Sequence, residues 1–98
     1  MTINSQISGM KEDAEMRRQV ESDLTGFQRL IAVSSVNVVL AHQSDVSPPF
    51  QASAMLTVPG PDIQAAARDH TWLAAWRKVV ARLREQIDER RSRQASHE

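Results

Sequence analysis

Residues 50–91, FQASAMLTVPGPDIQAAARDHTWLAAWRKVVARLREQIDERR, decide the fold. The first part, FQASAMLTV, alternates between apolar and more polar side chains, and this period of two predicts a strand with one buried face. The turn PGPD follows, because proline fixes φ and glycine allows positive φ. A second strand, IQAAAR (residues 63–68), comes next, and a long amphipathic helix completes the segment.

The start and the buried face of this helix can be predicted from its side chains. Asp69 or Thr71 can cap the first turn by accepting a backbone N–H. The apolar residues recur at helical spacing, so they should form a stripe against the strands. The stripe comprises Leu73, Trp76, Val80, Leu83 and Ile87, with Val79 beside it. Trp72, close to the helix start, should be partly buried.

The elements upstream follow from the same patterns. Residues 2–8 predict a short strand that Gly9 ends, residues 13–30 a helix, and residues 33–42 a central strand rich in β-branched side chains. The polar and proline-rich residues 43–49 predict a hairpin connection. The helix prediction rests on Met16, Val20, Leu24, Phe27 and Ile31, which fall on one helical face.

The order is therefore β-α-β-β-β-α, which predicts an α+β fold. We expect a two-layer sandwich, in which two helices cover one face of a four-stranded, mostly antiparallel sheet. The helix between the first two strands allows those strands to run parallel. One domain over residues 1–92 and a polar, disordered tail over residues 93–98 are expected.

Composition excludes several classes of protein. The chain has no cysteine, so disulfides, thiol nucleophiles and cysteine-ligated metals are ruled out. No apolar stretch is long enough for a signal peptide or a membrane span, which predicts a cytoplasmic protein without a membrane partner. The pairs His42 and Asp45, and Asp69 and His70, lack the further groups that a metal site or catalytic centre needs. We therefore expect no enzyme activity, no cofactor and no metal.

Charge is distributed unevenly along the chain. The formal net charge is zero, which argues against a general nucleic-acid binder, and no DNA partner is expected. Residues 1–69 carry five basic and eight acidic side chains, whereas residues 70–94 carry seven basic and three acidic ones. The last helix is thus a basic surface on a mildly acidic remainder, and such a patch can bind a partner.

The last helix and the order of elements resemble a known family. The helix starts with Ala74-Ala75, continues through Trp76, Val79 and Val80, and reaches the run Arg82-Leu83-Arg84-Glu85-Gln86-Ile87. This arrangement is similar to the hibernation-promoting factor/RaiA family of ribosome-associated proteins, also described as sigma-54 modulation proteins. The resemblance implies binding to RNA of the small ribosomal subunit, in the decoding channel, and translation regulation in ribosome hibernation or stress.

Basic residues on the two helices are the candidate RNA-binding residues. Arg77, Arg84 and Arg91 recur every seven residues along one side of the last helix, and arginine suits phosphate contact. The remaining candidates are Lys78, Arg82, Arg90, Lys11, Arg17 and Arg18. An alternative stays open: a protein-interaction module, including a homodimer through the sheet face that the helices leave uncovered, where Val39 and Met55 should lie.

Overall fold

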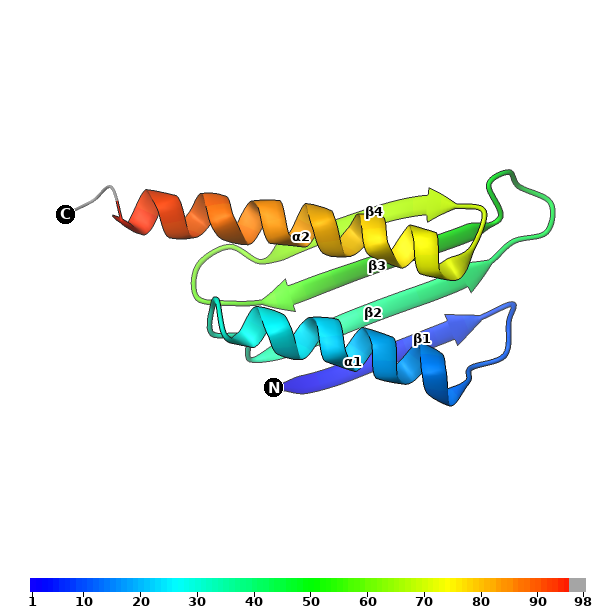
Figure 1. Ribbon diagram of the computed structural model, residues 1–98, viewed down its shortest axis with the longest axis horizontal. Coiled ribbons are helices and arrows are strands. Elements are labelled where there is room, and N and C mark those ends of the chain that lie inside the picture. The colour runs from blue at the N-terminus through cyan, green and yellow to red at the C-terminus, as the bar shows by residue number, and fades with distance from the viewer. Residues whose placement is uncertain (96–98) are drawn as a thin grey trace.

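The computed structural model describes residues 1–95 and contains all six predicted elements (Figure 1). The elements are β1 (Thr2–Ser8), α1 (Ala14–Gln28), β2 (Ser35–His42), β3 (Phe50–Thr57), β4 (Ile63–Asp69) and α2 (Trp72–Ala95). Their boundaries lie within about two residues of the predicted ones, except at the end of α2. That helix continues to Ala95, so the tail expected from residue 93 is helical at first. The rest of the expected tail, residues 96–98, lies outside the described residues.

The sheet has four strands in the order β1-β2-β3-β4. β1 and β2 run parallel, whereas β2 with β3 and β3 with β4 are antiparallel. Figure 1 shows α1 and α2 on the same face, with α1 over β1 and β2 and α2 over β3 and β4. The predicted two-layer α+β fold is confirmed, including the parallel first pair.

Strand register aligns the helix-facing residues of neighbouring strands, most of which are buried. Ile3 lies beside Val36, Val36 beside Leu56, and Leu56 beside Ile63. The next such row is Ser5, Val38, Ala54 and Ala65. A one-residue shift of β2, β3 or β4 would expose the buried residues of that strand, so burial fixes their register.

The uncovered face of the sheet is polar but almost uncharged. One row across it consists of Asn4, Asn37, Met55 and Gln64, and the next of Gln6, Val39, Ser53 and Ala66. Val39 is 39% exposed, as the sequence predicted for this face. Arg68, near the end of β4, is the charged residue that the strands place there.

The buried stripe of α2 differs from the predicted one. The buried residues are Ala75, Trp76, Val79, Leu83 and Ile87. Leu73 and Val80 are only half-buried, so the stripe is rotated toward Ala75 and Val79. The reason is the position of α2 above β3 and β4, where the alanines Ala52, Ala54 and Ala67 leave room for a close approach. Trp72 is partly buried, as predicted.

Single residues explain where both helices start and where one turn forms. The Asp13 carboxylate caps α1 by accepting the N–H of Met16 at 2.7 Å. Thr71 Oγ1 accepts the N–H of Ala74 at 3.1 Å and so caps α2, which decides between the two predicted caps. Gly9 ends β1 with φ of +73°, and a Cβ there would overlap the backbone carbonyl of His42. Only glycine fits this turn.

Candidate nucleic-acid interface

Six of the seven basic residues of α2 lie in two rows on different sides of the helix, and the seventh, Arg93, pairs with Glu89. Arg77, Arg84 and Arg91 are all exposed and lie on one side; we call them the α2 arginine row. Arg82 and Arg84 point about 160° apart, because two residues turn the helix by about 200°. The second row faces β4 and comprises Lys78, Arg82, Gln86 and Arg90; we call it the β4-facing row.

The β4-facing row donates hydrogen bonds to backbone carbonyls along the outer side of β4 and the turn before it. Lys78 Nζ donates to the Arg68 carbonyl at 3.5 Å, and Arg82 Nη1 donates to that of Ala66. Gln86 Nε2 donates to the Gln64 carbonyl at 2.8 Å, and Arg90 Nη1 to that of Pro59 at 3.4 Å. Four residues of helix rise about 6 Å and two residues of strand about 6.7 Å, so the two repeats nearly match.

Three predicted RNA-binding residues take part in this contact. β4 is an edge strand, and its outward carbonyls have no neighbouring strand. Lys78 and Arg82 bind those carbonyls, and Arg90 binds the Pro59 carbonyl in the turn before β4. Lys78 also pairs with Asp69, Nζ to Oδ2 at 2.8 Å. The hydrogen bond from Lys78 and then that from the His70 N–H hold the pKa of Asp69 below its usual value.

The side chains of the α2 arginine row form far fewer ion pairs and hydrogen bonds than those of the β4-facing row. Arg77 and Arg91 have no ion pair or hydrogen bond from their side chains to any residue in the described part of the chain. Arg84 Nε lies 3.9 Å from Asp88 Oδ2, and both side chains are more than half exposed. Exposed pairs of this kind contribute little free energy, so Arg84 can exchange Asp88 for another anion. This row therefore offers available guanidinium groups.

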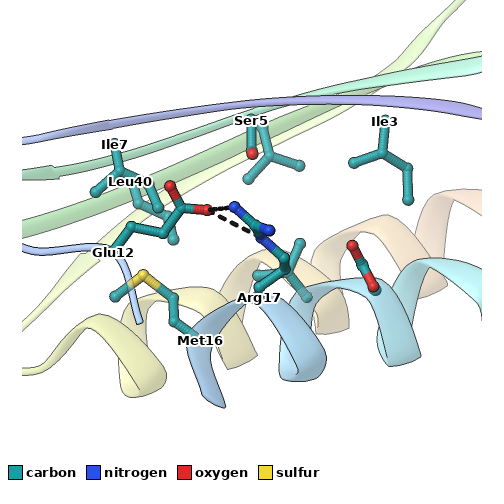
Figure 2. Close-up of a pocket in the computed structure, with 10 residues that line it drawn as sticks. Ile3, Ser5, Ile7, Glu12, Met16, Arg17 and Leu40 are labelled. Carbon is teal, nitrogen blue, oxygen red and sulfur yellow. Dashed lines mark hydrogen bonds and ion pairs between the residues drawn. The ribbon is translucent and has the colours of Figure 1, made fainter. Parts of the chain in front are cut away.

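The predicted cations in and just before α1 also include one bonded residue and two exposed residues without such contacts. Arg17 donates to Glu12 Oε1 through Nε at 3.1 Å and Nη2 at 2.7 Å, as Figure 2 shows. This hydrogen bond, and next the charge of Glu12, raise the pKa of Arg17. Lys11 and Arg18 are exposed and make no such contact with a described residue. Arg29, just beyond α1, is exposed too and was not among the predicted residues.

Other kinds of site are not seen in the described residues. Among residues 1–95, no group of three or more His, Cys, Asp or Glu side chains is placed to hold a metal ion. No helix in that part of the chain has the length and hydropathy to cross a membrane.

The comparison with known families identifies the chain. Residues 3–95 match the family described as Sigma 54 modulation protein / S30EA ribosomal protein. The chain belongs to this family. The match includes all six elements except Thr2 at the start of β1, and the predicted family resemblance is confirmed. No curated protein sequence matches the chain.

Two solved structures have a fold similar to that of this S30EA family member. The N-terminal domain of Protein Y from Thermus thermophilus superposes with a TM-score of 0.76 at 23% identity, covering 91% of this chain and 98% of that one. A ribosomal subunit interface protein from Coxiella burnetii superposes with a TM-score of 0.77 at 16% identity, covering 94% and 99%. At these identities the likeness concerns the fold.

Proposed function

We propose that this S30EA family member associates with the small ribosomal subunit by binding its RNA and thereby modulates translation. Two observations support the proposal. The family is described as ribosomal, and one similar structure is of a ribosomal subunit interface protein. The observation that carries the residue assignment is the α2 arginine row, with its exposed and largely unpaired guanidinium groups.

The chemistry of the row suits a structured RNA. Folded RNA is bound mainly through phosphates and shape, which requires spaced cations and no base-specific code. Residues seven apart on a helix are about 10.5 Å apart along its axis, so Arg77, Arg84 and Arg91 can reach separate phosphates. Exposed Arg18 and Lys11 are further cations on the α1 side of the molecule. The proposed role is one of hibernation or stress, in which an occupied decoding channel stops initiation.

The test is cosedimentation with small ribosomal subunits at about 50 mM and about 200 mM salt. The wild-type protein should sediment with the subunit at the lower salt and largely dissociate at the higher one. The double variant Arg77→Glu/Arg91→Glu should lose association at both. Neither residue has a described ion pair, so the melting temperature should change little.

A charge-matched control separates the row from net charge. Arg29→Glu/Arg68→Glu also changes two arginines, and each change removes two charge units, so both double variants carry −4 against zero in the wild type. The control should still sediment with the subunit. Equal loss in both variants, or wild-type association of the Arg77/Arg91 variant, would contradict the assignment.

The alternative function is homodimerisation through the uncovered face of the sheet. The observation in its favour is the neutral composition of that face, where Val39 and Met55 lie among asparagine, glutamine and serine side chains. Such an interface has few charges for salt to screen. A dimer that forms without RNA, persists at high salt and is lost in Val39→Lys would support this alternative.

A further inference from the structure

The two edges of the sheet are protected very differently. The β4 edge is covered by the β4-facing row, whose side chains bind its outward carbonyls. β1 forms the other edge, and its sequence, TINSQIS, contains no charged residue and no proline. Proteins usually protect an edge strand with charges, proline, a bulge or a covering element, because an open edge can pair with another strand.

The backbone groups on the outer side of β1 can be identified from its pairing. The N–H of Thr2 donates to the Ser34 carbonyl at 3.2 Å, so Thr2 points its backbone toward β2. Backbone direction alternates along a strand, and the N–H and C=O groups of Ile3, Ser5 and Ile7 therefore point away from the sheet. No residue in the described chain forms a hydrogen bond with these groups.

A groove runs beside this edge, between β1 and α1. Its volume is about 260 Å³. The half-buried Ile3 and Ile7 line it together with the buried Met16, Val20, Val38 and Leu40. Figure 2 shows the side chains of Ile3, Ser5 and Ile7 reaching down from β1 toward α1. The residues with outward backbone groups thus also present their side chains to the groove.

The rim of the groove is acidic. Glu12, Arg17 and Glu21 line it, which leaves one negative charge in excess. Arg17 is bound to Glu12, as Figure 2 shows, whereas Glu21 has no ion pair or hydrogen bond with a described residue. The charge of Glu21 acts on Arg17, but no hydrogen bond or ion pair occupies its carboxylate, so a cationic side chain entering the groove could bind it.

We propose that the β1 edge and this groove form a docking site for an extended peptide segment of a partner protein. The segment adds a strand beside β1 and pairs with the backbone of Ile3, Ser5 and Ile7. Its apolar side chains, at alternate positions, enter the groove, and a lysine or arginine binds Glu21. Strand addition works in this way generally: main-chain hydrogen bonds supply affinity, and pockets for alternate side chains supply specificity.

A second copy of the chain fits this edge less well than a peptide. Antiparallel pairing of two β1 strands would place both α1 helices on the same face of a joint sheet. Figure 1 shows the first turns of α1 projecting past β1, so in such a dimer the first turns of each α1 would lie over the other copy's β1. A peptide without a helix can lie beneath those turns. This site is separate from the α2 arginine row, so the inference does not depend on RNA binding.

The experiment is a selection of random peptides about ten residues long, enough to span β1, on the immobilised wild-type chain. Selected peptides should alternate apolar residues and contain a lysine or arginine. Their affinity, measured by fluorescence anisotropy, should fall about tenfold or more in Ser5→Pro, which removes an outward N–H that the sheet does not use. Glu21→Arg should weaken binding similarly. Ala66→Pro, the same change on the β4 edge, should leave it unchanged.

Backbone amide exchange in the wild-type protein provides a measurement that does not depend on the variants folding. Bound peptide should protect the N–H groups of Ile3, Ser5 and Ile7 specifically. The proposal is overturned if no peptide is enriched, if selected peptides bind Ser5→Pro as tightly as wild type, or if these three amides stay unprotected. If the wild type forms a dimer in sedimentation and Ser5→Pro abolishes it, the partner at this edge is a second copy of the chain and the peptide proposal is wrong.

Discussion

The indole Nε1 of Trp76 donates a hydrogen bond to Asp23 Oδ2 at 2.7 Å and thereby joins the two helices. Trp76 is fully buried, and the same carboxylate oxygen accepts the Gln19 side-chain amide at 3.0 Å. A buried indole N–H needs an acceptor, since an unpaired one loses its hydration without compensation. The Asp23 carboxylate therefore links α1 to the buried side of α2.

The first prediction concerns this bond. Asp23→Ala should lower the free energy of unfolding by about 1–3 kcal/mol, because the Trp76 N–H is left buried and unpaired. Asp23→Asn retains a carbonyl oxygen at the site and should cost less. Urea unfolding of both variants, alone and combined with Trp76→Phe, measures the coupling. If Asp23→Ala costs as much in the Trp76→Phe background as in the wild type, the two changes are additive and the bond does not contribute.

The second prediction concerns the close approach of α2 to the sheet. Ala75 is fully buried against the alanine-rich strands, whereas Ala81 lies exposed on the same helix. Ala75→Leu should destabilise the protein by about 1–3 kcal/mol, because the added atoms have no space. Ala81→Leu introduces the same side chain at an exposed position and should be nearly neutral. Equal melting temperatures of the two variants would show that α2 is not tightly packed at Ala75.

The order of elements could be predicted because each has a strong local pattern. The alternation in β3 and the β-branched run of β2 predicted their buried faces correctly. The stripe of α2 could not be placed as well, because Ala75 is a weak hydrophobic signal and its burial depends on the small residues of β3 and β4. Helical spacing alone favoured Leu73 and Val80, which the structure leaves half-buried.

The candidate site shows a similar limit. The seven-residue spacing identified Arg77, Arg84 and Arg91 as one row, and the structure leaves them exposed. Nothing local to α2 reveals that Lys78 and Arg82 reach carbonyls of a strand that precedes the helix in the chain. A signal was nonetheless present. Long polar side chains recur every four residues beside the buried stripe, which is where a helix flank meets a sheet edge.

The third prediction is a pH dependence of stability. The pKa of Asp69 is lowered in the folded protein, chiefly by the hydrogen bond from Lys78. Its contribution is therefore present above the unfolded value of about 3.8 and is lost as the pH falls through the lower folded value. Asp69→Asn should reduce stability near pH 6 but have a smaller effect near about pH 3. Urea unfolding at both values checks this, and a cost that grows toward low pH would contradict it.

The last prediction separates the two rows of α2 by two measurements. Arg82→Ala/Gln86→Ala uncovers the carbonyls of Ala66 and Gln64 on the β4 edge, so this variant should self-associate in sedimentation. Arg84→Ala removes the same charge from the α2 arginine row and should remain as monomeric as wild type.

For ribosome association the pattern should reverse. Arg84→Ala should lower the slope of log affinity against log salt by about 0.7–0.9, the value for one phosphate contact, whereas the Arg82 variant should keep the wild-type slope when measured at dilutions where it is monomeric. If the slope of log affinity against log salt falls equally in both variants, Arg82 also contacts RNA. The division of α2 into a structural and a binding row would then be wrong.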